Sequence, residues 1–163
     1  EKESEADRFD AARTLRHLCD SLIQIRTTPQ LLIMGDFNDT PENASITEVL
    51  GAMSVCTKAE TSTLYNLFAN PHTLNFPGTH KYQGEWSQLD QIIVSGNLIN
   101  KDSRMHIIPE SIRIFAPDFL FTKDKTWHGK RPARTYYGFK YEGGYSDHLP
   151  LITDFLLSLP TED

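Results

Sequence analysis

The spacing of apolar residues at the start of the chain predicts a long amphipathic helix, over about residues 3 to 27. Apolar or small side chains recur every three or four residues, as on one face of an α-helix; they are Ala6, Phe9, Ala12, Leu15, Cys19, Leu22 and Ile23. Glu3, Glu5 and Asp7 fall in the first turns, where the helix dipole favours negative charge. Thr27-Thr28-Pro29 ends the pattern.

Short apolar runs predict strands in the rest of the chain. They cover residues 31–34, 78–82, 86–95, 105–115 and 151–157, with a turn at Gln83-Gly84 and an interruption at Pro109. Asp39 before Pro41 predicts the start of a second helix, reaching about Leu50. Residues 64–68 predict a short helix, and residues 116–145 show no period. Helices and strands in this arrangement indicate one domain of the α/β class.

Three polar motifs stand at the ends of predicted strands. Gly35-Asp36-Phe37-Asn38 follows the first strand, Asp90 interrupts the apolar run of residues 86–95, and Ser146-Asp147-His148 precedes the last strand. Alternate residues of an extended segment point to the same side, so Asp36 and Asn38 should face one way. Strand ends hold polar groups rigidly, which favours a catalytic site there.

The side chains in these motifs suit hydrolysis of a phosphate ester. A carboxylate such as Asp36 accepts a proton or binds a metal, and the amide of Asn38 orients a water molecule. A buried Asp90 requires a partner, and His148 is the candidate, because an Asp–His pair fixes the tautomer of the imidazole and favours its cation. Local turn chemistry for Asp36 and Asn38, and backbone amides as partners of Asp90, are the alternatives.

Composition narrows the range of functions. The chain has 163 residues and a formal net charge of −6, which disfavours a strongly electrostatic DNA-binding protein. No apolar run approaches the roughly 20 residues that span a membrane. Cys19 and Cys56 form neither a disulfide framework nor a zinc-binding spacing. The cellular compartment stays unassigned.

Residues 123–141 combine basic and aromatic side chains. Six lysines and arginines stand there with the single acid Asp124, among tryptophan, tyrosine and phenylalanine residues. Such a mixture holds phosphates and stacks on bases or sugars. We therefore take Lys130, Arg131, Arg134 and Tyr145 as candidate substrate-binding residues. The alternative is a solvated loop whose aromatic side chains pack on the domain.

Together the three motifs resemble those of the endonuclease/exonuclease/phosphatase superfamily, which includes pancreatic deoxyribonuclease and the abasic-site endonucleases. The resemblance implies a divalent-metal-dependent phosphoesterase that uses Mg²⁺, with Mn²⁺ as an alternative. It implies that Asp36 and Asn38 position and activate water. It also implies that Asp90 orients His148 toward the scissile phosphate, and that Asp147 is a metal ligand or water contact. Nucleic acids, sphingolipids and inositol phosphates are the candidate substrates.

A competing pattern is the Gly-Asp-x-x-Asp element of calcineurin-like metallophosphoesterases, which Gly35 to Asp39 also fits. Those enzymes need a later Gly-Asn-His, whereas Gly96-Asn97 is followed here by Leu98. This pattern is therefore the weaker of the two.

The chain also departs from the superfamily pattern. No strand carrying the early asparagine or the metal-binding glutamate of the superfamily precedes the first helix, and the chain begins with Glu1. We therefore expect residues 1–163 to form the C-terminal part of a two-sheet α/β sandwich whose N-terminal part is missing, weakly active or inactive alone. A non-catalytic binding or scaffold domain is the alternative.

A divided two-sheet fold also predicts partners. The partner is either the missing N-terminal half or a second copy, bound through the face that carries alternate residues of 89–94 and 151–157.

Overall fold

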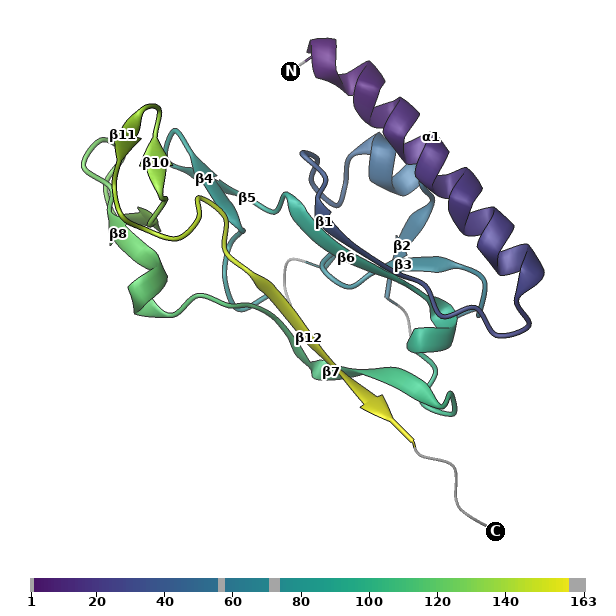
Figure 1. Cartoon of the computed structure of the whole chain (residues 1–163). Helices are drawn as coiled ribbons and strands as arrows, with labels where there is room; N and C mark the ends of the chain where they lie inside the picture. Colours follow the sequence, from purple (N-terminus) through teal and green to yellow (C-terminus); the bar gives the residue numbers. More distant parts are fainter. Residues whose placement is uncertain (1, 56–57, 71–73, 159–163) are drawn as a thin grey trace.

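Helix α1 (Lys2–Ile25) lies across one face of a four-stranded sheet in the computed structural model, which describes residues 2–55, 58–70 and 74–158 (Figure 1). The strand order is β1 (Leu32–Asp36), β6 (Asp90–Ser95), β3 (Leu64–Asn66), β2 (Ala52–Ser54). β2 and β3 are parallel and the other pairs are antiparallel. The predicted first helix and first strand are thus confirmed, with the strand shifted by one or two residues.

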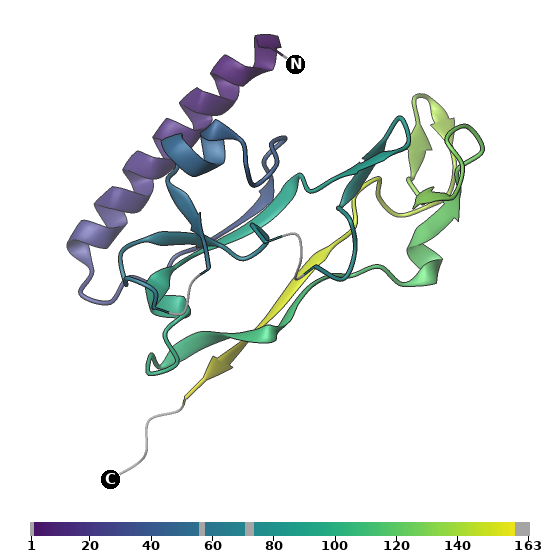
Figure 2. The same ribbon diagram turned by 180° about the vertical axis from the view of Figure 1, so that it is seen from behind.

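The opposite face of this sheet is covered by an antiparallel ribbon of β7 (Met105–Ile114) and β12 (Leu151–Leu157), so that the sheet lies between helix and ribbon (Figure 2). Ile93 is buried in the cluster on the helix side, whereas Ile92 and Val94 are buried with ribbon residues such as Ile107. A strand buried on both faces requires a continuous apolar run, which is what β6 has.

Pro109 lies inside β7 without ending it, because the pairing shifts register there. Ile152 pairs with Arg113 and Asp154 pairs with Ile108, so the intervening residues of β7 bulge. The hydroxyl of Ser111 fills the gap by accepting from the amide of Asp154 at 2.7 Å. A proline is tolerated at such a bulge because no ladder hydrogen bond is required of it.

The predicted hairpin around Gln83-Gly84 is present as β4 (His80–Tyr82) and β5 (Glu85–Ser87). Both turn residues have positive φ, 49° and 93°, as a tight hairpin turn requires. The single strand predicted over residues 86–95 is wrong: it is divided into β5 and β6. Between them the amide of Leu89 turns to the hydroxyl of Thr79, which breaks the ladder.

Two predicted helical segments differ in the structure. Residues 64–66 form strand β3, since they pair between β2 and β6, a non-local contact that overrides local preference. The helix predicted over residues 39–50 is reduced to one π-turn, η1 (Ser45–Val49). Asp39 does not cap it: its buried carboxylate pairs with Arg8 of α1 at 2.8 Å and accepts from the Ser45 hydroxyl at 2.5 Å.

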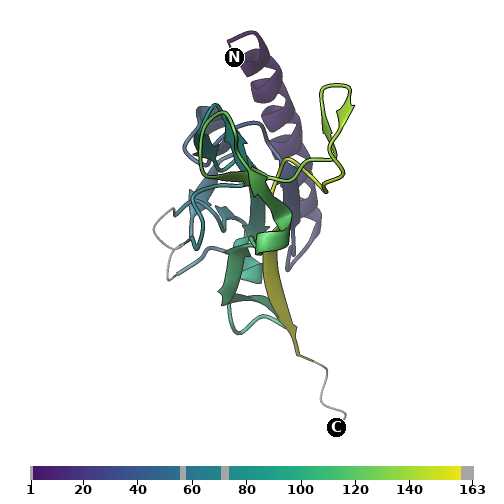
Figure 3. The same ribbon diagram turned by 90° about the vertical axis from the view of Figure 1, so that its left-hand side faces the viewer.

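The segment that showed no period is built from short hairpins. It begins with the 3₁₀ turn η4 (Asp118–Leu120), and β8 (Phe121–Lys123), β9 (Lys130–Pro132), β10 (Tyr136–Tyr137) and β11 (Lys140–Tyr141) follow. A separate 3₁₀ turn, η3 (Gly96–Leu98), lies between β6 and β7. β8 pairs with β9 and β10 with β11, and the second hairpin projects from the molecule (Figure 3). We call residues 118–145 the aromatic module, because Trp127, Tyr136, Tyr137, Phe139, Tyr141 and Tyr145 are all exposed there.

The sheet face predicted to be uncovered is only partly so. Ile92 and Val94 of β6 are 5% and 0% exposed, because the β7–β12 ribbon covers them. The prediction that the β6 part of this face is uncovered is therefore wrong. Exposed apolar side chains remain on the edge strand β1, at Leu32 and Met34, and at the end of β12, at 156–157. The α/β class itself is confirmed, with mixed strands and one main helix.

Candidate functional site

His148 is positioned by backbone pairing with the segment that leads into β4. Residues 80 and 148 form an antiparallel bridge, and the amide of Leu149 donates to the carbonyl of Thr79 at 2.8 Å. Gly78 lets the segment before β4 pass close to the end of β5, because a Cβ there would lie 2.7 Å from the backbone of Ser87. The last motif of the chain is thereby fastened beside the start of β6.

His148 and Asp90 form the pair that the sequence predicts. Nδ1 of His148 lies 2.7 Å from Oδ2 of Asp90, and both side chains are about one fifth exposed. The hydrogen bond that His148 donates to Asp90 is the largest cause that raises the pKa of His148; burial opposes it. The negative charges of Asp90, Asp36 and Asp147 add to the rise. The contact at Nδ1 leaves Nε2, on the other side of the ring, free of Asp90.

Asp90 is held as a carboxylate despite its burial. Burial acts most strongly and raises the pKa of Asp90, but the hydrogen bonds from His148 and Thr79 and the charge of His148 together lower it below the ordinary value. The anionic form therefore persists in the folded state, as a permanent partner for an imidazolium.

Asp36 and Asn38 adjoin this pair. Asp36 pairs directly with Asp90 across β1 and β6, so their side chains share one face of the sheet. The backbone amide of Asn38 donates to Oδ1 of Asp36 at 2.8 Å, in a turn where Asn38 has a φ of 51°. Local turn chemistry is therefore present, and the turn leaves both side chains exposed at the end of the strand. Asp36, Asn38, Asp90 and His148 thus gather at one rim of the sheet, as predicted.

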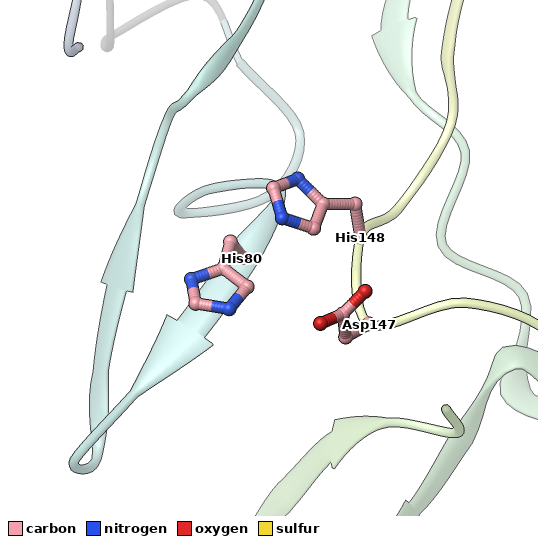
Figure 4. A group of neighbouring side chains, drawn as sticks. All are labelled: His80, Asp147 and His148. Atoms are coloured by element: carbon pink, nitrogen blue, oxygen red, sulfur yellow. The ribbon is translucent and has the colours of Figure 1, made fainter. Parts of the chain in front are cut away.

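His80 also lies in the site, although no motif in the sequence predicted it. Its ring lies 4.6 Å from that of His148 with 31° between the planes. The ligand atoms of His80, Asp147 and His148 all lie within 4.8 Å of one another (Figure 4). Burial lowers the pKa of His80, and the neighbouring His148 lowers it further. The predicted hairpin pairs His80 with Ser87, and the bridge to residue 148 that brings His80 into the site has no signal in the sequence.

An open groove of about 870 Å³ adjoins the site rather than enclosing it. It runs between the first half of α1, the loop of residues 38–43 and the β4–β5 hairpin. Asn38 and His80 line it, together with Asp7, Arg8, Thr40 and Tyr82. The groove therefore reaches the rim where the four predicted residues meet.

The candidate substrate-binding residues divide into two groups. Lys130 lies 4.0 Å from the ring centroid of Phe121 and 3.6 Å from Asp118, and Arg131 pairs with Glu142 at 2.8 Å. Their charges are balanced within the aromatic module. Arg134 is close enough to His80 for its charge to lower the pKa of that residue, and exposed Tyr145 directly precedes Ser146. These last two are the candidates beside the site.

A sequence model of the Endonuclease/Exonuclease/phosphatase family matches residues 1–156. The chain belongs to this family. No curated protein and no solved structure matched the chain significantly. Within the described residues, no helix is long and apolar enough to cross a membrane.

The site fits the divalent metal ion that members of this family generally use. Asp36, Asn38 and Asp147 present exposed oxygen donors at one rim, and oxygen ligands are those that Mg²⁺ prefers. Asp39, the second acid of the competing Gly-Asp-x-x-Asp pattern, is buried against Arg8 and is not among these donors. The family assignment and the donor set therefore agree.

Proposed function

We propose that this member of the Endonuclease/Exonuclease/phosphatase family hydrolyses phosphate esters at the rim formed by Asp36, Asn38, Asp90 and His148. The observation that carries the proposal is the 2.7 Å contact between Asp90 and Nδ1 of His148, directly beside Asp36 in the register of β1 and β6. Such a carboxylate–imidazole pair at a strand end is poised for acid–base or electrostatic work on a substrate.

His148 would act on the phosphate. Its Nε2 faces away from Asp90 and would donate to a phosphate oxygen. The raised pKa of the imidazole keeps it protonated over a wider pH range, so that positive charge faces the negative charge that develops on phosphorus oxygens. Asp90 would hold the ring orientation and compensate its charge.

Asp36 and Asn38 would act on the water. The Asp36 carboxylate would accept a hydrogen bond or proton from the attacking water, and the Asn38 amide would orient it. The backbone amide of Asn38 donates to Oδ1 of Asp36 at 2.8 Å. This hydrogen bond restrains the two residues relative to one another, which limits the reorganisation needed during reaction.

A bound Mg²⁺, or Mn²⁺ in its place, supplies Lewis-acid stabilisation of the phosphate charge. Asp147 and Asp36 are the carboxylates that would hold it. Arg134 and Tyr145 would contact the substrate next to the site, and Lys130 and Arg131 of the preceding strand β9 are the further candidates. A nucleic acid is one candidate substrate, because the exposed aromatic side chains of the module suit stacking.

Turnover of bis-p-nitrophenyl phosphate with Mg²⁺ tests the proposal. We expect slow hydrolysis by this chain, abolished by a chelator, and faster hydrolysis by a longer polypeptide that adds upstream sequence of the same domain. Each missing electrostatic group commonly costs about 10²–10³ in rate. Full activity of this chain, lost in His148→Ala, would show that it supplies its own metal site. A longer polypeptide with no metal-dependent hydrolysis would instead support a non-catalytic scaffold domain.

We also propose that this chain is the C-terminal part of a two-sheet sandwich. Leu32 and Met34 are 44% and 70% exposed on the face where Ile92 and Val94 are already buried, so further strands would extend that cover. At roughly 25 cal/mol per Å², leaving such a surface bare forgoes stabilisation. Without upstream sequence, a second copy should cover it, and light scattering should show a mass that rises with concentration. A monomer at all concentrations, unchanged in Met34→Lys, would contradict this.

A further inference from the structure

His80, Asp147 and His148 form the one group of three His, Cys, Asp or Glu side chains in the described residues whose ligand atoms lie within 4.8 Å of one another. They come from two segments, the start of β4 and the loop before β12, and converge on one small space (Figure 4). From this geometry we propose that they form a site for a nitrogen-preferring transition-metal ion such as Zn²⁺, and that its occupation blocks the site around His148.

The donor set points to the class of metal. Two imidazoles and one carboxylate suit Zn²⁺ and its first-row neighbours, whereas Mg²⁺ and Ca²⁺ prefer oxygen alone. His80 contributes the second nitrogen, and no oxygen-only site would require it. The fourth position would be left to water, as in other sites with three protein ligands.

The surroundings of His148 match those of a metal-binding histidine. Its Nδ1 is bonded to Asp90 at 2.7 Å, which leaves Nε2 as the ligand. Metal-bound histidines commonly carry such a carboxylate on the other ring nitrogen, because it fixes the tautomer and raises the basicity of the ligand. Asp90 would thus orient His148 for metal binding without contacting the ion itself.

The local charge also favours a cation. Asp36 and Asp147 both act electrostatically on the two rings, and Asp90 acts on His148. Arg134 is the positive group that faces His80. Three carboxylates therefore oppose one guanidinium around the space where the ion would bind.

Only a small adjustment would bring the ligands into place. Ligands at 2.0–2.1 Å from a tetrahedral zinc ion lie about 3.3 Å apart, compared with separations of up to 4.8 Å here. Asp147 is exposed and His80 and His148 are partly exposed, so rotation about their side-chain bonds can close the gap. The bridge between residues 80 and 148 keeps the two backbones in register.

Occupation of this site would remove His148 from the reaction. An ion on Nε2 displaces the proton that would otherwise be donated to the phosphate, releases it to solvent, and occupies the position that would face the phosphate. Zn²⁺ should therefore inhibit Mg²⁺-dependent hydrolysis; this consequence, unlike the binding itself, rests on the proposed function.

Metal binding can be measured without any activity. We would titrate the metal-free chain, with Cys19→Ser and Cys56→Ser to exclude thiol ligands, with Zn²⁺ against a chromophoric chelator, and record the visible spectrum of the Co²⁺ form. We expect one ion per chain, bound at least about tenfold more weakly in His80→Ala and about 10–100-fold more weakly in Asp90→Asn. His17→Ala, which changes an exposed histidine on α1, is the matched control and should bind as before. Equal affinity in His80→Ala and His17→Ala would overturn the site.

The second measurement separates binding from regulation. If the chain hydrolyses bis-p-nitrophenyl phosphate, Zn²⁺ added at constant Mg²⁺ should inhibit it, and His80→Ala should raise the inhibitory concentration in proportion to its weaker binding. Zinc binding that depends on His80 but leaves turnover unchanged would overturn the inhibitory role and keep the site. If neither this chain nor the longer polypeptide shows turnover, the proposed function and the inhibitory role are both overturned. The binding measurement alone decides whether the zinc site exists.

Discussion

Replacing His148 with alanine should lower phosphodiester turnover by about 10²–10³-fold, the usual cost of removing one preorganised electrostatic group. The fold should survive, because residue 148 is held by backbone bonds between residues 79–80 and 148–149 that alanine retains. The measurement is kcat/KM for bis-p-nitrophenyl phosphate with Mg²⁺, beside circular dichroism and thermal melting. His17→Ala, on the exposed face of α1, should retain the full rate.

Asp90→Asn removes the negative charge of the Asp90–His148 pair while keeping a side chain of nearly the same shape. The pKa of His148 is raised chiefly by the hydrogen bond to Asp90, so the variant should lower it, which a proton NMR titration of the metal-free chain will show. Because the folded pKa is raised, the pair stabilises the fold fully below the ordinary value of 6.5. It loses this contribution as the pH rises through the folded pKa. If activity depends on the imidazolium, its loss as the pH rises should occur at a lower pH in the variant than in the unmodified chain. An unchanged pKa of His148 would contradict the assigned role of Asp90.

The sequence predicted the elements whose pattern is local or continuous. The apolar stripe of α1 and the apolar run of β6 were predictable from the sequence. Each pattern extends over consecutive turns or residues, and residues of each are buried in the core. Residues 64–66 were misread as helix, since their pairing with β2 and β6 is a non-local contact that three residues cannot signal. The short hairpins after residue 118 have only two or three residues per strand, too few to show alternation.

The candidate site was predictable to the extent that its residues sit at strand ends. Asp36 and Asp90 were each readable there, and the antiparallel register of β1 and β6 then places them opposite one another. His80 was missed, because its place beside His148 depends on a bridge between two segments 68 positions apart. The pairing of Arg131 with Glu142 was also missed. It neutralises the charge of Arg131 within the aromatic module, so that this charge is less available to a substrate.

Replacing Lys81 with methionine should lower the free energy of unfolding by about 3 kcal/mol, the lower end of the usual cost of breaking a buried ion pair. Lys81 of β4 is 9% exposed and its Nζ lies 2.9 Å from Oδ2 of buried Asp124 and 2.8 Å from the carbonyl of His128. Methionine keeps the volume but leaves the Asp124 carboxylate buried without its cation. The hydrogen bond to Lys81 helps to lower the pKa of Asp124, after the larger effect of the Trp127 amide. Urea unfolding is the measurement, and Lys125→Met, an exposed lysine of the same loop, is the matched control.

A double variant decides whether the loss comes from the unpaired charge. Lys81→Met with Asp124→Asn removes both charges but keeps an acceptor for the amides of Thr126 and Trp127, which bond Oδ1 of Asp124 at 3.1 and 2.9 Å. It should recover much of the lost stability, because replacing both partners of a buried pair is often nearly neutral. The same pair fastens the aromatic module to the strand that carries His80, so Lys81→Met should also disturb the ring signals of His80 and His148. A single variant as stable as Lys125→Met, with those signals unmoved, would show that the module is held in place by its apolar contacts alone.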